Sequence, residues 1–233
     1  MIIFALRLDP SEVSVGQANR WLKRARVSLA EAMRLAAVDL LDIDFNELCV
    51  GSRSRLDGSG ESAFADVFLF DSLSSGAGYS SALSKGHNLE KLFGKTRGIL
   101  TSCDCEDACF SCLKHYYNKQ FHNQLDRHAA LDLLDYAMNG TVRNHVSDGD
   151  ARDAFASLAE VIQDDVRAVC SFKSDKMTFM LDGKETTLTC LPDMKPKVSA
   201  SAVNEYWQYE LKHNVPGIVE TLIKERSGDS TLF

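Results

Sequence analysis

Four cysteines lie close together in this chain of 233 residues, and their spacing is typical of a metal site. They are Cys103, Cys105, Cys109 and Cys112. Thiolates this close repel one another unless a cation neutralises them, and Zn²⁺ accepts four sulfur ligands in a tetrahedron at about 2.3 Å. Because four sulfurs fill the coordination shell, such an ion is structural and keeps no open position for hydrolysis. The sequence therefore predicts one structural Zn²⁺.

Three other interpretations of the cluster remain open. The cysteines could be reduced and metal-free, or they could hold an iron–sulfur cluster, although their spacing matches neither ferredoxin pattern. A redox dithiol of Cys109 and Cys112 alone would leave Cys103 and Cys105 unexplained. The remaining cysteines lie in apolar runs and are interpreted as small buried hydrophobic residues. They are Cys49, Cys170 and Cys190.

Basic and aromatic residues surround the cysteine cluster and are candidates for DNA contact. Lysine and arginine side chains contact phosphates, and an aromatic ring stacks on a base. The candidate phosphate ligands are Lys95, Arg97, Lys114, Lys119 and Arg127, and the candidate stacking residues are Tyr116, Tyr117 and Phe121. Two observations favour a purely structural role. The aromatic spacing also suits a buried helical stripe, and Asp104, Glu106 and Asp107 would repel phosphate.

Other short patterns give weaker indications of chemistry. The small-residue loop Gly76–Gly78 either allows close backbone packing or holds a phosphate at a helix N-terminus. Asp193 with Glu210 and Lys212 superficially imitates a Mg²⁺-dependent nuclease motif, but the last two fall in a predicted helix. His122 and His128 are interpreted as structural, because the cysteines already complete the metal shell.

Composition limits the class of protein. The formal net charge is -7, so any DNA contact must come from a local patch. Hydrophobic residues make up 45% of the chain, enough for one sizeable core or two modest ones. No apolar run approaches the ~18 residues that cross a bilayer, and the start lacks a signal peptide, so we expect a cytoplasmic protein without membrane contact.

Alternating helix and strand patterns predict a mixed α+β fold. Ser28 and Glu31 form a capping box, which predicts a helix from Ser28 to about Leu41. The start of the chain, 1–7, reads as a buried strand, and three apolar runs read as strands covered on both faces. These runs are 48–50, 67–70 and 98–101, and the polar stretch 51–62 reads as a surface loop.

The second half of the chain contains a predicted boundary. Asp126 is expected to cap a helix that ends near Gly140, and the polar stretch 144–150 is the best candidate linker. Beyond it we expect a helix, β-type runs at 168–172, 177–181 and 186–191, a hairpin turn at Asp182–Gly183, and two closing helices that include Tyr206 and Trp207. The predicted domains are residues 1–143 and a small α+β appendage at 150–233.

Several motifs in order resemble one known family. The residues that carry the resemblance are 66–71, Gly76 to Tyr79, the four cysteines with Leu113, then Asn118, His122 and Leu125–Arg127. Together they resemble the zinc-binding C-terminal domain of MrfA-type bacterial helicases, which also occurs in antiphage defence proteins, including those of the DISARM system. The resemblance covers about 28–140. Ser75, Ala108 and Phe110 depart from the family pattern, and the tail after Gly140 has no recognised counterpart.

The resemblance implies a function in DNA repair or antiphage defence. In that family the four cysteines bind zinc, and the domain supports a superfamily 2 DNA helicase or translocase. This chain lacks a complete nucleotide-binding loop, because Leu89 stands where the motif that ends in Gly94-Lys95-Thr96 needs glycine. We therefore expect a non-enzymatic accessory module, encoded separately or as a C-terminal fragment, with Met1 favouring a subunit. The alternative is a protein-interaction adaptor with a scaffold zinc site.

Overall fold

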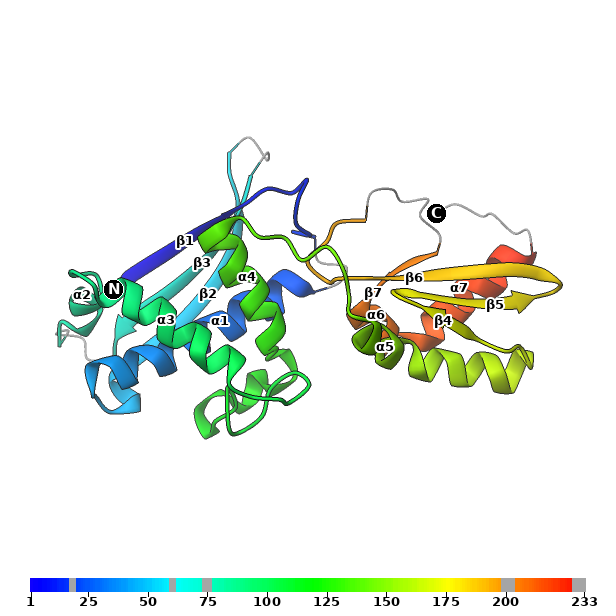
Figure 1. The fold of residues 1–233 in the computed structure, drawn as a ribbon. Coiled ribbons are helices and arrows are strands. Elements are labelled where there is room, and N and C mark those ends of the chain that lie inside the picture. Colours follow the sequence, from blue (N-terminus) through cyan, green and yellow to red (C-terminus); the bar gives the residue numbers. More distant parts are fainter. Residues whose placement is uncertain (17–19, 59–61, 73–76, 198–203, 228–233) are drawn as a thin grey trace. The chain divides into compact units, whose positions relative to one another are not determined.

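The computed structural model describes residues 1–16, 20–58, 62–72, 77–197 and 204–227. The chain folds as two compact units, Met1–Val142 and Arg143–Phe233, each with its own sheet (Figure 1). Helices and strands are mixed in both units, so the α+β class predicted from the sequence is confirmed. No helix in the described part of the chain has the length and apolarity needed to span a bilayer.

A three-stranded antiparallel sheet forms the base of the first unit. Its strands are β1 (Ile2–Leu8), β2 (Leu48–Leu56) and β3 (Ala63–Asp71), in the order β1-β3-β2. Alternate residues of β3 point into the core and are almost fully buried; these are Ala63, Ala65, Val67 and Leu69. The period-two alternation of a strand thus places one face of the sheet against the helices.

Helices cover that buried face. They are α1 (Trp21–Leu41), α2 (Tyr79–Leu83), α3 (Asn88–Thr101) and α4 (Arg127–Asn139), with short 3-10 helices η1 (Phe45–Glu47) and η2 (Tyr116–Gln124). Helix α1 packs on α3, α4, β2 and β3, so it is the central element of the unit (Figure 1). The core includes Trp21, Leu29, Met33, Leu92 and Leu133.

The predicted start of α1 at Ser28 is wrong. The helix begins seven residues earlier, at Trp21, and both members of the apparent capping box are buried inside it. The Ser28 hydroxyl accepts a hydrogen bond from the Asp126 amide at 2.7 Å, and the Glu31 carboxylate lies 2.9 Å from His115 Nε2. A polar residue inside a helix can thus form a hydrogen bond with a residue far away in the chain, although its local sequence matches the pattern of a helix cap.

Two other local predictions in the first unit are also corrected. Gly98–Thr101 is the last turn of α3 and not a strand, because Leu92, Thr96 and Leu100 at four-residue spacing form its buried face. The expected surface loop after Val50 continues β2 as far as Leu56, which pairs with Ala63. Ladder hydrogen bonds to β3 therefore outweigh the turn-like composition of this stretch.

The second unit is built around another sheet. Helix α5 (Asp148–Val161) and the π-turn η3 (Ile162–Val166) precede β4 (Ser171–Lys173), β5 (Lys176–Leu181) and β6 (Lys184–Leu191); β7 (Glu205–Trp207), α6 (Gln208–His213) and α7 (Val215–Ser227) follow. The strand order is β4-β5-β6-β7, with β6 and β7 parallel. The hairpin turn is confirmed at Asp182 and Gly183, whose φ angles are 51° and 77°.

Two expectations for this unit differ from the structure. The predicted linker contains the start of α5, because the Ser147 hydroxyl accepts a hydrogen bond from the Asp150 amide at 3.1 Å and caps the helix. Tyr206 and Trp207 lie in β7, whereas the sequence suggested a helix. The strand forms because its backbone pairs with Cys190 and Leu191 of β6. An apolar cluster that includes Phe155, Leu158, Met177, Phe179 and Leu188 fills the core.

Candidate metal centre

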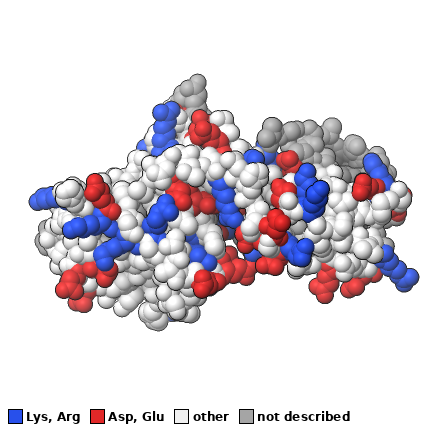
Figure 2. Space-filling model, in the orientation of Figure 1, with Lys and Arg blue, Asp and Glu red and all other residues white. Residues whose placement is uncertain are grey.

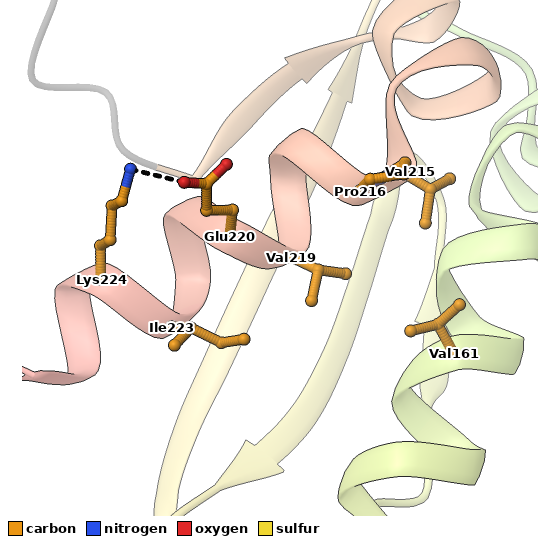
Figure 3. Close-up of a pocket in the computed structure, with 7 residues that line it drawn as sticks. All are labelled: Val161, Val215, Pro216, Val219, Glu220, Ile223 and Lys224. Atoms are coloured by element: carbon orange, nitrogen blue, oxygen red, sulfur yellow. Dashed lines mark ion pairs between the residues drawn. The ribbon is translucent and has the colours of Figure 1, made fainter.

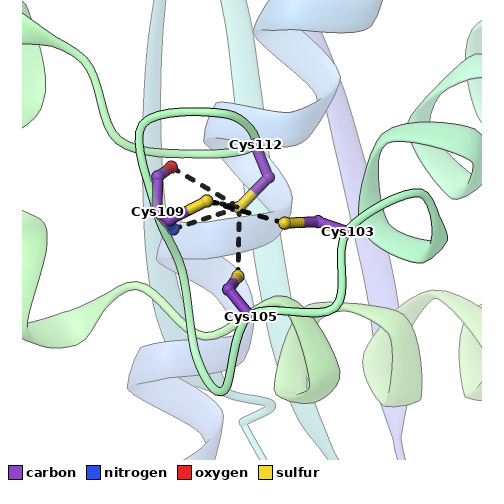
Figure 4. A group of neighbouring side chains, drawn as sticks. All are labelled: Cys103, Cys105, Cys109 and Cys112. Carbon is purple, nitrogen blue, oxygen red and sulfur yellow. Dashed lines mark hydrogen bonds between the residues drawn. The ribbon is translucent and has the colours of Figure 1, made fainter.

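The four clustered cysteines lie on one loop between α3 and η2 (Figure 4). Helix α3 ends at Thr101, and Cys103 and Cys105 follow directly. The chain then turns through Cys109 and Cys112, and all four sulfur atoms lie within 4.8 Å of one another. Among the described residues, this is the one group of His, Cys, Asp and Glu side chains close enough to hold a metal ion.

The distances between sulfur atoms fit tetrahedral zinc. Zn–S bonds of about 2.3 Å in a tetrahedron place the sulfurs about 3.8 Å apart. The Sγ atoms of Cys103 and Cys109 are 3.5 Å apart, those of Cys105 and Cys112 are 3.6 Å apart, and those of Cys109 and Cys112 are 3.9 Å apart. The donor set and its spacing therefore suit one Zn²⁺ with a closed shell.

Backbone hydrogen bonds shape the turn between Cys109 and Cys112. The Cys109 carbonyl accepts from the amides of Cys112, Leu113 and Lys114 at 2.9 to 3.2 Å. The Cys109 amide in turn lies 3.2 Å from the Cys112 sulfur, and the Ser111 amide lies 3.3 Å from the Cys109 sulfur. N–H groups directed at sulfur stabilise thiolates and so reduce the excess negative charge of a four-thiolate site.

The same surroundings separate the pKa values of the thiols. The hydrogen bond from the Ser111 amide, helped by Cys103, lowers the pKa of Cys109 to about 6. Burial, reinforced by the neighbouring cysteines, raises the pKa of Cys105 to about 12. Burial also raises the pKa of Cys112. Cys109 thus ionises readily while Cys105 and Cys112 hold their protons, so zinc must displace protons as it binds.

Arg127 fastens the cysteine loop to two helices. It is the first residue of α4, and its Nε donates to the Cys105 carbonyl at 2.8 Å while Nη1 lies 3.3 Å from the Leu100 carbonyl of α3. Its own amide donates to the Asp107 carbonyl at 2.8 Å. This residue was expected to contact DNA; its position instead favours a role in holding the metal loop.

A second set of side chains holds the segment that follows the cysteines. The buried Asn118 amide group donates to the Leu113 carbonyl at 2.9 Å and accepts from the His115 amide at 2.9 Å. His122 Nε2 lies 3.0 Å from Asn118 Oδ1 and 3.1 Å from the His115 carbonyl. The structural interpretation of His122 is thus supported, because its ring bonds the protein and lies outside the sulfur cluster.

A buried polar network anchors α4 to α1 beside the metal loop. Asp126 caps α4 as predicted, accepting from the Ala129 amide at 2.9 Å, and it also forms a buried ion pair with Arg24. Ser28 accepts from the Asp126 amide, and Glu31 reaches His115. These partners lie about a hundred residues apart along the chain, so local sequence patterns could not identify them.

The remaining basic candidates have different surroundings. Lys95 pairs with Asp39 and Arg97 pairs with Asp135, both at partly exposed positions of the first unit. Lys114 is half-buried, and the exposed Lys119 lies with its Nζ 4.5 Å from the Tyr116 ring centroid. Basic and acidic side chains alternate on the visible face of each unit, without a large patch of one sign (Figure 2).

The aromatic residues near the cysteines are not a buried stripe. Tyr116 is 71% exposed and Tyr117 is 54% exposed, and the ring of Phe110 inside the cysteine loop is 75% exposed. Phe121 is partly exposed as well. The burial expected from their helical spacing is therefore wrong, because they lie on a 3-10 helix whose buried residue is Asn118.

The structure does not support a phosphate-binding role for the weaker sequence patterns of the first unit. The amides of Gly78 and Ser80, at the start of α2, donate to the Asp71 carboxylate at 2.8 and 2.9 Å, so a side chain already occupies that helix start. Gly76 lies outside the described residues. Thr96 is buried inside α3 and bonds the Leu92 carbonyl, an environment unlike a phosphate-binding loop.

The nuclease-like residues of the second unit are likewise engaged locally. Asp193 Oδ1 accepts from the Tyr209 amide at 2.9 Å, and Glu210 pairs with Lys197 at 3.1 Å. Glu210 lies in helix α6, which agrees with the helix predicted for this residue from the sequence. Asp193 therefore has a structural partner at the start of α6.

A comparison with known protein families agrees with the metal centre. Residues 29–113 match the family model of the MrfA Zn-binding domain. The chain is 36% identical over 125 residues to the Druantia protein DruE of Escherichia coli (strain UMEA 4076-1), a match that covers 53% of this chain and 7% of that protein. A solved structure of the DUF1998 helicase MrfA bound to DNA matches 52% of this chain and 15% of the helicase chain, at 17% identity and a TM-score of 0.39.

The family match falls on the residues that build the site. It begins at Leu29 within α1, spans the sheet strands β2 and β3, and ends at Leu113, directly after the last cysteine of the cluster. The matched portions make up only small fractions of both relatives, so their activities as whole proteins are not transferred to this chain. Residues 29–113 are a MrfA-type zinc-binding domain, and its cofactor is one structural zinc ion.

Proposed function

We propose that this chain is a non-enzymatic, zinc-stabilised module that docks on an ATP-dependent superfamily 2 DNA helicase or translocase and helps it engage DNA. The observation that carries the proposal is the closed four-sulfur site within a MrfA-type domain. In this proposal Cys103, Cys105, Cys109 and Cys112 are the zinc ligands. A shell filled by protein sulfurs keeps the loop folded and leaves no position where a substrate could bind the metal.

The relatives support a role beside a motor. The solved relative is named as a helicase bound to DNA, and the curated relative is a Druantia protein. The domain occupies a small share of each, so the ATPase would come from another chain or from further residues of a longer protein. The process served is antiphage defence or DNA repair, and the Druantia relative favours defence.

The surface around η2 is the proposed DNA contact. Tyr116, Tyr117 and Phe110 are exposed, and Lys119 lies over the Tyr116 ring. Exposed aromatic rings beside a lysine suit stacking of a base next to a phosphate contact. The exposed acids Asp104 and Glu106 border this surface and would restrict the approach of the phosphate backbone.

The proposal is tested by affinity capture of the tagged full chain from its native cell. Captured proteins are identified by mass spectrometry, and zinc is measured in the same eluate. We expect an ATPase with helicase motifs and about one zinc per chain. Zinc-loaded protein recovered without a motor would contradict the docking role.

DNA engagement is tested on the captured complex with two variants. Tyr116→Leu combined with Lys119→Gln is expected to weaken DNA binding several-fold, because it removes a stacking ring and a cation. Lys85→Gln, at an exposed position before α3, is the matched control for loss of one charge. Equal affinities of the two variants would contradict contact by η2.

An apolar groove in the second unit favours a second candidate function, that of a protein-interaction adaptor. Its volume is about 540 Å³, and it is lined by Val161, Val215, Pro216, Val219 and Ile223, with the Glu220–Lys224 ion pair at its edge (Figure 3). Ile223 is 54% exposed. Exposed apolar side chains around a groove are typical of interaction sites.

The adaptor candidate predicts a separation of two binding activities. Ile223→Glu in the full chain should abolish capture of the partner while DNA binding of the chain stays unchanged. Lys224→Gln, one residue away on the same helix, serves as the control. If Ile223→Glu leaves every captured protein in place, the groove is not the docking site.

A further inference from the structure

The sheet of the first unit has a second face, opposite the one packed on the helices. Strands covered on both faces were expected from their near-continuous apolar runs, but this face is open: Ile3 of β1 is 47% exposed and Phe70 of β3 is 37% exposed. Helices α1, α3 and α4 gather on the other side (Figure 1). An open sheet face that carries large apolar side chains needs an explanation.

Aromatic rings follow the central strand of this face. Phe64, Phe68 and Phe70 occupy alternate positions of β3, and Asp66 completes the series. The central ring has a small neighbour on one side only, since Phe68 pairs with Gly51 of β2 and with Ile3 of β1. A Cβ at Gly51 would lie 3.6 Å from Phe68 Cδ2, so glycine keeps one edge of that ring uncovered.

Arginines border the aromatic rings. Arg53 and Arg55 of β2 bond the Asp66 carboxylate at 3.0 and 2.9 Å, yet their side chains remain 61% and 40% exposed. Arg7 of β1 lies in the same row as Phe64. The Arg7 guanidinium donates to the Ser62 hydroxyl, while Arg53 and Arg55 share the Asp66 carboxylate, so the three arginines and one aspartate have a formal net charge of +2. This excess contrasts with the net negative charge of the whole chain.

Burial and ion pairing of Asp66 keep the arginines in place. Its side chain is only 2% exposed, and although burial opposes its ionisation, the hydrogen bonds from Arg53 and Arg55 hold the pKa of Asp66 below its ordinary value. The Arg55 guanidinium also lies 3.9 Å from the Phe64 ring centroid. Asp66 therefore orients the Arg53 guanidinium over Phe68 and the Arg55 guanidinium over Phe64 before any ligand binds.

We propose that this face, which we call the aromatic sheet face and define by Arg7, Phe64, Phe68, Phe70, Arg53 and Arg55, binds single-stranded DNA. Bases stack on the Phe70 ring and on the guanidinium planes that lie over Phe64 and Phe68, and the arginine N–H groups contact the phosphates that connect the bases. Stacking on aromatic rings and guanidinium planes within a positive surface is the general basis of single-strand recognition.

The geometry favours a single strand over a duplex and over a protein partner. Bases in a duplex are already stacked on each other and cannot present their faces to a flat three-stranded sheet, whereas unpaired bases can. The excess of positive charge beside the rings complements a phosphate chain, and it would oppose docking of a neutral apolar protein surface. The choice of DNA over RNA rests on the proposed function as a module of a DNA motor.

Fluorescence anisotropy of a labelled oligo-dT strand with the zinc-loaded full chain, at about 150 mM salt, tests the proposal. Phe64→Leu combined with Phe68→Leu keeps apolar side chains but removes the rings that hold the stacking guanidinium planes. One stacked base contributes about 1–3 kcal/mol, roughly a 5- to 150-fold change in affinity, so we expect at least fivefold weaker binding. A duplex of the same length should bind more weakly than the single strand.

A second pair of variants keeps the test valid if the double variant folds poorly. Gly51→Glu places a carboxylate beside Phe68 without steric conflict, because the nearest atom is at an ordinary contact distance. Ser54→Glu adds the same charge at an exposed position of the same strand, but at a residue that alternates with Gly51 and so belongs to the other face of the sheet. We expect Gly51→Glu to weaken binding at least fivefold more than Ser54→Glu does.

Specific outcomes overturn the proposal. Unchanged affinity in both the double phenylalanine variant and Gly51→Glu excludes the aromatic sheet face, and tighter binding of duplex or of oligo-rU excludes single-stranded DNA as its ligand. The Tyr116→Leu and Lys119→Gln variant is measured in parallel. If that variant alone loses binding, the DNA contact is at η2, so the proposed function stands while this inference fails. If the capture experiment recovers no motor, the proposed function is contradicted, but the inference about the aromatic sheet face is not.

Discussion

The two compact units of this chain stabilise their folds by different means. In the second unit an apolar cluster that includes Phe155, Met177 and Phe179 connects the helices to the sheet. In the first unit the segment between α3 and α4 is long and contributes few buried apolar side chains, mainly Leu113 and Leu125. The four sulfurs lie in that segment, which buries few apolar side chains.

This difference shows how a bound metal ion can stabilise a segment that buries little apolar surface. A segment that cannot bury enough apolar surface does not offset the entropy of ordering its backbone. A zinc ion bound by four thiolates supplies that free energy through only a few residues. The hydrogen bonds of Arg127 and Asn118 connect the ordered loop to α4 and η2. The first unit should therefore depend on zinc, and the second should not.

The largest expected effect separates the units by their dependence on metal. Cys109→Ser, or treatment with a strong chelator, should destabilise the first unit by several kcal/mol, because structural zinc supplies about 10–16 kcal/mol of apparent binding free energy in zinc-finger peptides. Hydrogen exchange should show lost protection in the segment after α3 and in the first turn of α4, with β5 and β6 unchanged. Zinc content is measured in the same samples.

Cys170→Ser provides the control for that experiment, because Cys170 lies in the second unit and outside the sulfur cluster. It should leave zinc content and exchange in the first unit unchanged. Equal loss of protection in both units after zinc removal would refute the idea that they are stabilised independently.

The converse change should affect the second unit alone. Phe155→Ala opens a cavity at a fully buried position and should cost about 3–5 kcal/mol in free energy of unfolding. Zinc content should remain at the level of the unchanged chain. Phe110→Ala, at an exposed ring, is the matched control and should alter stability little, as followed by chemical denaturation. Loss of zinc from Phe155→Ala would show that the units are coupled.

A smaller effect tests how the metal loop is fastened within the first unit. Arg127→Ala removes two hydrogen bonds from a charged donor and should cost about 1.5–3 kcal/mol, with faster transfer of zinc to a chelator. Arg97→Ala breaks a partly exposed ion pair and should cost about 1 kcal/mol or less. If both variants release zinc at the same rate, Arg127 does not hold the loop.

The smallest effect concerns the buried polar contact between α1 and α4. Ser28→Ala leaves the Asp126 amide without its acceptor and should cost about 1 kcal/mol. Hydrogen exchange should quicken at the first turn of α4 and not at the start of α1, with the exposed Ser81→Ala as control. Faster exchange at the start of α1 would instead support the original capping interpretation.

The clustering of the four cysteines could be predicted from the sequence because its determinants are local. The four sulfur ligands occur within one short loop, and the chemistry of zinc needs little more than their number and spacing. The cap at Asp126 and the turn at Asp182–Gly183 were predicted for the same reason, since each depends on residues adjacent in the chain.

What the sequence did not predict depends on distant partners. Ser28 and Glu31 matched a local capping pattern, but their partners Asp126 and His115 lie 98 and 84 residues away. The open sheet face was missed because an apolar run does not reveal which side receives a helix. The alternation of phenylalanine with Asp66 in β3 was the available indication, because an ionised side chain rarely points into an apolar core.

The distance between Ser28 and Asp126 has a consequence for synthesis of the chain. A ribosome that adds about 5–20 residues per second completes α1 on the order of 5–20 seconds before Asp126 is made. During that interval Arg24 lacks its later partner Asp126, and Glu31 lacks its later partner His115 until shortly before the interval ends. The cysteine loop, by contrast, closes within about a microsecond once its residues emerge, because it spans so few of them. The nascent chain therefore contains the complete cysteine loop before it contains α4, the helix that packs on α1.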